Sequence, residues 1–184
     1  MQIYHGVRMK YINLTIVLIA ILLALGCNKA NEKSLPDLVV LKYDSLLVDS
    51  VVNITSDLVV ANLIEWTLDQ ETSEAEEDMI FFNNINSYGM ITAKAYSDGK
   101  ILDYVEEIKT TFHNATVLSD SEYIFNENNY YQYILQSKEY ILLKAIIEIN
   151  ENDYIDTNIL VLESKYPELA RMIETYLASI SILN

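Results

Sequence analysis

Residues 140–162 read YILLKAIIEI (140–149), NEND (150–153) and YIDTNILVL (154–162), and this stretch decides the fold. The odd positions from Ile141 to Ile149 are all apolar, whereas the even positions become polar at Lys144 and Glu148. A period of two is typical of a strand that has one buried face and one face partly in contact with water. Because the polar run 150–153 predicts a turn and alternation resumes after it, the stretch predicts an antiparallel hairpin.

The neighbouring segments extend this pattern in both directions. Strands are predicted at 79–85, 88–96, 121–125 and 130–136, the last two across an Asn-rich turn. Apolar residues at three- and four-residue spacings predict a helix over 101–112, with Asp98 as its N-cap. Ser164 is predicted to cap a closing helix whose apolar face carries Leu169, Ile173, Tyr176, Leu177 and Ile180. The order predicts an α+β fold in which an antiparallel sheet packs against helices as a sandwich.

The segment before residue 79 gives a weaker signal. Leu38 to Val52 fits one or two strands or a helix equally well. Thr55, Ser56 and Asp57 offer N-caps for residues at helical spacing, which favours a helix up to about residue 69. Residues 71–78 contain five acids in eight positions, and we expect a solvated loop there.

The N-terminus has the features of a secretory signal. Arg8 and Lys10 precede Leu14 to Leu25, a twelve-residue run in which only Thr15 is polar. A membrane-spanning helix needs about 20 apolar residues, so cleavage is favoured over a permanent span. We therefore predict a signal peptide at 1–26, a polar tether at 27–36 and one α+β domain at 37–184.

The end of this signal, Ala24-Leu25-Gly26-Cys27, resembles the lipobox of bacterial lipoproteins, in which the cysteine is acylated and becomes the new N-terminus. Cys27 is the only cysteine, so it has no partner for an intramolecular disulfide. The alternative is that Cys27 is an incidental residue of an ordinary signal or a short anchor. Asn28 stands where such lipoproteins often carry an inner-membrane retention Asp, so the resemblance implies an outer-membrane protein that faces the periplasm.

The charge limits the choice of partners. Without residues 1–26 the chain keeps 10 basic and 27 acidic residues, a formal charge of −17. Nucleic-acid binding depends on Lys and Arg at phosphates, so this class is excluded. An anionic bilayer repels such a domain, which leaves the lipid as its membrane contact, whereas a basic protein partner is attracted. Simple solubility in the envelope is the alternative explanation of the charge.

Residues 88–183 resemble the PsbP-like domains, a group with a photosystem oxygen-evolving subunit, a eukaryotic Ran-binding protein and the bacterial DcrB-type envelope lipoproteins. The resemblance is carried by the helix at 101–112, the segment YYQYIL (130–135), the strands at 140–149 and 154–162, and the closing YLASI (176–180). It implies a PsbP-like sandwich and a non-catalytic domain that docks onto larger assemblies. It transfers no functional residue, since fold alone does not fix function.

Parts for catalysis are scarce. In the mature chain His113 is the sole histidine, so hydrolase triads and multi-His zinc sites lack their components. His113 itself lies at the end of the predicted helix, which favours a structural role for its side chain. Glycine remains only at Gly89 and Gly99, which excludes a phosphate loop. Acid pairs such as Glu106/Glu107 and Glu151/Asp153 point apart. We predict no enzyme, no cofactor and no metal site.

Two further features leave alternatives open. The run 150–153, followed by Asp156 and Asn158, is oxygen-rich, but it lacks the spacing, central Gly and terminal Glu of an EF-hand, so a plain turn is favoured over calcium binding. The predicted strands carry Tyr123, Tyr130, Tyr131, Tyr133, Tyr140 and Tyr154. Packing within the sheet is favoured over a ligand platform for these tyrosines.

Three classes of function remain. The leading hypothesis is a lipid-anchored cell-envelope protein that acts as a non-catalytic binding or assembly module for an unidentified protein partner. The alternative is a periplasmic immunity or inhibitor lipoprotein that binds a basic toxin or enzyme, which the charge of −17 favours. An enzyme is the third class.

Overall fold

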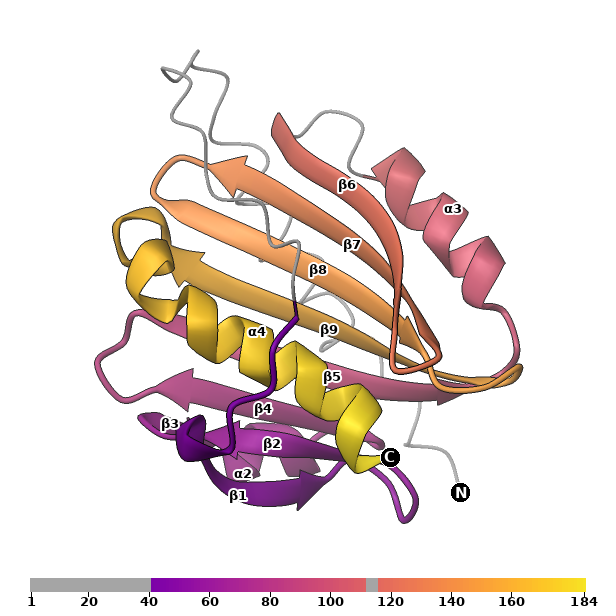
Figure 1. Cartoon of the computed structure of the whole chain (residues 1–184), viewed down its shortest axis with the longest axis horizontal. Helices are drawn as coiled ribbons and strands as arrows, with labels where there is room; N and C mark the ends of the chain where they lie inside the picture. Colours follow the sequence, from indigo (N-terminus) through magenta and orange to yellow (C-terminus); the bar gives the residue numbers. More distant parts are fainter. Residues whose placement is uncertain (1–40, 112–115) are drawn as a thin grey trace, which may run out of the picture. The chain divides into compact units, whose positions relative to one another are not determined.

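The computed structural model of the chain describes residues 41–111 and 116–184. These residues form a seven-stranded antiparallel sheet, a separate two-stranded sheet and three α-helices (Figure 1). The prediction of an α+β fold with an antiparallel sheet packed against helices is therefore confirmed. Within the described residues, no helix is both long and apolar enough to cross a bilayer.

The hairpin predicted from 140–162 lies at the centre of the large sheet. The strand order is β3 (Trp66–Leu68), β4 (Met79–Asn84), β5 (Gly89–Ser97), β9 (Asp153–Leu162), β8 (Tyr140–Glu148), β7 (Asn128–Ser137) and β6 (Thr116–Phe125). Leu143 pairs with Ile159 and Ile147 with Ile155, as the alternation requires. The six strands predicted from residue 79 onward are all present, and β6 begins five residues earlier than predicted.

One face of this sheet packs against α4 (Tyr166–Leu183), which runs across it in Figure 1. The odd positions of β8 and β9 point to this side, and with the helix they bury the main core. Its members include Ile91, Ile134, Ile141, Leu143, Ile147, Ile155 and Ile159 from the sheet and Leu169, Ile173, Tyr176, Leu177 and Ile180 from α4. The predicted apolar face of the closing helix is thus confirmed. Its predicted cap is wrong, because Ser164 lies in the preceding 3-10 turn η2 (Glu163–Lys165) and Lys165 is the N-cap residue.

The opposite face is covered in part by α3 (Ile101–Thr111). The helix buries Ile101, Val105 and Ile108 toward the even positions of β8 and β9. Here one expectation needs correction, because Lys144 is only 4% exposed instead of facing water. A helix covers it, and Asp156 on the neighbouring strand pairs with its charge.

The N-terminal part forms strands where a helix was predicted. After a short 3-10 turn, η1 (Ser45–Leu47), β1 (Val48–Asn53) pairs with β2 (Val59–Leu63), and β3 follows at once. The hydroxyl of Thr55 accepts the N–H groups of Asp57 and Leu58, so these polar residues close a hairpin and do not cap a helix. The helical spacing of the apolar residues predicted the wrong element, because the β-branched and aromatic residues of this segment also favour strands.

The acidic segment predicted as a loop contains one short helix, α2 (Gln70–Glu74). Asp69 caps it by accepting the N–H of Thr72 at 3.0 Å. The rest of the segment up to Asp78 connects α2 to β4, and its Glu76 forms an ion pair with Lys94 of β5.

Candidate functional site

The hairpin of β6 and β7 lies at one end of the large sheet, and its outer strand β6 contains no buried residue. Its two turn residues, Asn126 and Glu127, both have positive φ (49° and 68°), as a tight two-residue hairpin requires. The register runs from Phe125 opposite Asn128 to Thr116 opposite Gln136, with a shift between Val117 and Ser119. The hairpin is therefore long, and its pairing is continuous from Ser119 to its turn.

Side-chain hydrogen bonds attach this hairpin to the C-terminal end of α4. The hydroxyl of Tyr130 donates to the carbonyl of Leu177 at 2.9 Å and lies 2.7 Å from the hydroxyl of Ser181. The amide of Asn128 donates to the Ser181 hydroxyl at 2.9 Å. These contacts hold the tip of the hairpin against the helix.

Stacked aromatic rings add to this anchor. Tyr123 stacks on Tyr130 with ring centroids 5.2 Å apart, and Phe125 meets the same ring edge-on. The Tyr123 hydroxyl donates to Gln132 at 2.8 Å. Burial raises the pKa of Tyr130 to about 12, while its hydrogen bond to Ser181 opposes the rise. The phenol therefore stays protonated near neutral pH and can donate its hydrogen bond.

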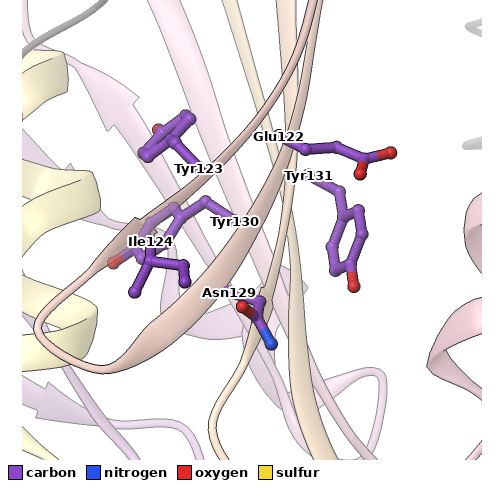
Figure 2. Close-up of a pocket in the computed structure, with 6 residues that line it drawn as sticks. All are labelled: Glu122, Tyr123, Ile124, Asn129, Tyr130 and Tyr131. Carbon is purple, nitrogen blue, oxygen red and sulfur yellow. The ribbon is translucent and has the colours of Figure 1, made fainter.

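A hollow of about 220 Å³ lies at this end of the hairpin. It is lined by Glu122, Tyr123, Ile124, Asn129, Tyr130 and Tyr131 (Figure 2). Figure 2 shows Tyr123 and Tyr130 on one side of the strand pair, with Glu122 and Tyr131 directed to the other. Ile124 is 73% exposed, so an apolar side chain stands in water at the rim of this hollow.

A second candidate site is a buried charge cluster under α3. The ammonium of Lys144 lies 2.6 Å from Oδ1 of Asp156 and donates to the side-chain oxygen of Asn158 at 3.1 Å. The hydroxyl of Tyr104, from α3, donates to Oδ2 of the same carboxylate at 2.6 Å. Asn158 in turn donates to the hydroxyl of Thr92 at 3.3 Å. The cluster therefore links three strands and the helix.

Three tyrosine rings surround this cluster. Tyr96, Tyr104 and Tyr154 lie with ring centroids 5.0–5.9 Å apart, and the Lys144 ammonium lies 5.5 Å from the centroid of the Tyr104 ring. Burial first, and then the charge of Asp156, raises the pKa of Tyr104 well above its ordinary value. The same two causes in the same order raise the pKa of Tyr96 to about 12.

The chemistry of this cluster suits attachment better than reaction. Both oxygens of the Asp156 carboxylate are occupied, and the Lys144 ammonium already has two acceptors. A lysine held as an ammonium in a closed ion pair is a poor nucleophile, because its lone pair carries a proton. We interpret the cluster as the fixture that joins α3 to the sheet.

The residues singled out in the sequence do not converge on one site. Cys27 and His113 lie outside the described residues. The six tyrosines divide between the two faces of the sheet, with Tyr123 and Tyr130 toward α4 and Tyr131, Tyr133, Tyr140 and Tyr154 toward the other face. Three of them, Tyr130, Tyr133 and Tyr154, are buried, so they form no single platform.

The oxygen-rich run 150–153 is a turn held by its own side chains. The side-chain oxygen of Asn150 accepts the N–H groups of Asn152 and Asp153. Asp156 and Asn158 lie beyond it on β9 and bond to Lys144. In the described part of the chain, no three His, Cys, Asp or Glu side chains gather closely enough to hold a metal ion.

The sequence did not reveal two features of the candidate sites. The sequence pattern predicted Lys144 on a face partly in contact with water. Leu142 and Ile146 flank Lys144 on the same face of β8, and these apolar neighbours indicate that the face is covered. The sequence also gave no role to the exposed apolar residues of β6. Ile124 is an apolar residue in an alternating strand, and only the position of β6 at the sheet edge shows that its side chain is exposed.

With this architecture in view, the domain has a PsbP-like fold. The solution structure of cyanobacterial PsbP (CyanoP) from Synechocystis sp. PCC 6803 matches it with a TM-score of 0.52 at 12% identity, covering 85% of this chain and 97% of that one. A crystal structure of PA94, a protein of unknown function from Pseudomonas aeruginosa, matches with a TM-score of 0.46 at 8% identity and covers 71% and 94% of the two chains. No protein-family model matches the chain, and no curated protein matches it. The first match extends the likeness well beyond residues 88–183.

Proposed function

We propose that this protein is a lipid-anchored cell-envelope protein whose domain acts as a non-catalytic binding or assembly module. The observation that carries the binding role is the exposure of apolar side chains on β6. Of the eight large apolar residues exposed in the described part, Val117, Leu118 and Ile124 all belong to this one strand. Exposed apolar groups that are concentrated on one element are typical of a surface that a partner covers.

The binding role is tested by cross-linked affinity purification of the lipidated protein from native membranes, with mass spectrometry. A stoichiometric envelope complex is the expected result. The matched variant is Ile124→Lys, which keeps the fold's buried residues and places a charge on the exposed strand. Recovery of the same partner in the same yield with this variant would contradict a binding role for β6.

Lipid anchoring is a separate part of the proposal and rests on Ala24-Leu25-Gly26-Cys27 after the apolar run. Several acyl chains hold a protein at a membrane far more firmly than one. Metabolic labelling with an alkyne fatty acid should mark the wild-type protein and leave Cys27→Ala unmarked. The proposed location is the outer membrane, facing the periplasm, and density-gradient separation of the membranes tests it. A labelled Cys27→Ala variant would argue against acylation at this residue.

A second candidate function is an immunity or inhibitor lipoprotein for a basic toxin or enzyme. The charge of −17 after signal removal favours it, because opposite charge accelerates encounter. The rate of association with such a partner should fall steeply as salt rises. An association rate that does not change with salt would count against the inhibitor.

The absence of catalysis is also part of the proposal. The occupied state of the Lys144 and Asp156 side chains supports it. Turnover of an esterase, phosphatase or glycosidase substrate that vanishes in His113→Ala or in a Glu106/Glu107 double variant would overturn it.

A further inference from the structure

We propose that β6 is the docking strand for an extended, lysine- or arginine-bearing segment of a partner protein, which adds to the sheet as an eighth strand. This inference rests on the proposed binding role and specifies its geometry. It also specifies the chemistry of the bound segment.

The first argument is the position and length of β6. The strand is ten residues long, lies at the end of the sheet, and pairs with β7 alone among the described strands. The strand at the other end, β3, has only three residues. Natural sheets protect long edges with short strands, prolines, charged side chains (lysine above all), β-bulges or covering elements. β6 (TVLSDSEYIF) contains neither proline nor lysine, its charged residues are acids, and its register shift lies at Val117–Ser119, outside the segment 120–125.

The second argument is the direction of its backbone groups. In an antiparallel pair, residues alternate between those that bond the neighbouring strand and those that point away from it. A two-residue turn joins Phe125 to Asn128, so this first pair is of the bonded kind. Alternation from Phe125 then directs the N–H and C=O groups of Ile124 and Asp120 away from β7. These groups are placed to bond an added strand.

The third argument is the chemistry of the side chains. Asp120 and Glu122 are exposed acids on β6, and Val117 and Ile124 are 48% and 73% exposed. Alternate side chains of an added strand would therefore meet acids and apolar groups on the same face. A segment that carries Lys or Arg together with apolar residues complements this surface. The net charge of the mature chain attracts the same partner.

The same charges disfavour a second copy of this chain as the occupant. Two β6 strands that paired antiparallel about Ser121 would place Asp120 of one copy opposite Glu122 of the other. Like charges directly opposite each other destabilise a strand pair. A basic segment removes this repulsion, so a different protein fits the edge better than a homodimer does.

The anchor on α4 prepares the strand for docking. Tyr130 and Asn128 hold the hairpin to Leu177 and Ser181, so the exposed edge is ordered before a partner arrives. A preorganised surface loses less entropy on binding than a flexible one. The hollow beside Ile124 adds room for a side chain of the added strand.

The test uses the full-length protein in a nonionic detergent and a fluorescent peptide with alternating Lys and Val, blocked at both ends. Ile124→Pro removes the outward N–H group, which β7 does not use, and proline is tolerated at such edge positions. We expect this variant to bind the peptide about tenfold more weakly, the equivalent of about one lost hydrogen bond. The matched control Ile124→Ala keeps the N–H group, and its affinity for the peptide should fall by less than about threefold. Circular dichroism confirms that both variants fold.

A second pair of variants separates local from general charge attraction. Asp120→Lys should lower the affinity for the peptide. Glu71→Lys should not, because Glu71 lies on α2, beside β4 near the opposite end of the sheet. An equal loss of affinity in the two variants would show attraction by net charge alone and overturn the proposal. A peptide with N-methyl groups along its bonding edge should not bind, and unchanged binding of this peptide would also overturn it.

Three further outcomes distinguish this inference from the proposed function. Self-association that Ile124→Pro abolishes in sedimentation would make a second copy the occupant and overturn the inference. A native partner that cross-links equally to wild type and Ile124→Pro would preserve the binding module and overturn strand addition. Loss of that partner with Ile124→Pro but not with Ile124→Ala would support both.

Discussion

The Lys144 ammonium lies 2.6 Å from the Asp156 carboxylate under α3, and the two side chains are 5% and 8% exposed. The carboxylate also accepts the hydroxyl of Tyr104 from the helix. A charge in such a place is stable only with its partner, because water no longer solvates it. The position of α3 on the sheet is thus coupled to one ion pair between β8 and β9.

Loss of Lys144 should therefore destabilise the domain strongly. Lys144→Met keeps most of the side-chain volume but leaves the Asp156 carboxylate buried without its cation. Breaking a buried pair in this way costs about 3–5 kcal/mol. Urea unfolding at neutral pH, followed by circular dichroism, measures the change in the free energy of unfolding.

Two controls show whether the charge is the cause. The double variant Lys144→Met with Asp156→Leu removes both charges and should recover part of the lost stability, although the Tyr104 hydroxyl then loses its acceptor. Lys165→Met removes a lysine from the exposed pair with Glu168 and should leave stability nearly unchanged. A double variant no more stable than Lys144→Met would show that packing, and not the unpaired carboxylate, dominates.

The hydroxyl of Tyr104 should matter chiefly to the helix. Tyr104→Phe keeps the ring beside Tyr96 and Tyr154 and removes the hydroxyl that donates to Asp156 and also bonds the Tyr96 side chain. A hydrogen bond to a charged group contributes about 1.5–3 kcal/mol. We expect faster amide exchange in α3 than in wild type, with little change in β8. Unchanged exchange in α3 would contradict the attachment role of the cluster.

Much of this fold was predictable from the sequence because its strong signals are local. The alternation in 140–149 and the spacing of Val105 and Ile108 both follow from one buried face. A helix was predicted up to about residue 69 because Val60, Leu63 and Ile64 follow helical spacing, whereas these residues form β2 and the turn after it. Tertiary contacts decide there: the Ser179 hydroxyl of α4 accepts the N–H of Ala61, and a side-chain hydrogen bond from so distant a residue leaves no trace in local periodicity.

The candidate sites were less predictable for the same reason. The Lys144–Asp156 pair joins residues that are only twelve apart, yet its burial depends on α3, which the sequence does not place over that face. Likewise, the exposure of Ile124 follows from the position of β6 at the end of the sheet. An exposed edge of this kind depends on which strand lies at the end of the sheet, and the register of a single hairpin does not fix that order.

Alkaline pH should destabilise the domain through its buried and half-buried phenols. The pKa of Tyr96 and that of Tyr130 are each raised to about 12 from an ordinary value of 10.0. The folded state therefore holds these protons more tightly than the unfolded chain does. Their stabilising contribution is complete below pH 10 and is lost as pH rises toward about 12.

Phenolate absorbance and far-UV circular dichroism, titrated together, test this prediction. We expect the buried tyrosines to ionise in the same steep step in which secondary structure is lost. Tyr96→Phe removes one of these groups and should make the fall in stability with pH less steep. Gradual ionisation of every tyrosine near pH 10 with the fold intact would contradict the assigned burial.

The hydroxyl of Tyr130 should control how firmly the β6–β7 hairpin is held to α4. Tyr130→Phe removes its bonds to Leu177 and Ser181 while keeping the stacked ring, and we expect a loss of about 1–3 kcal/mol from these buried groups. Amide exchange should then rise at residues 123–131 more than in β8. Tyr123→Phe is the matched control, because its hydroxyl bonds only within the sheet, to Gln132. If both variants loosen the hairpin equally, the contact with α4 is not what orders the edge strand.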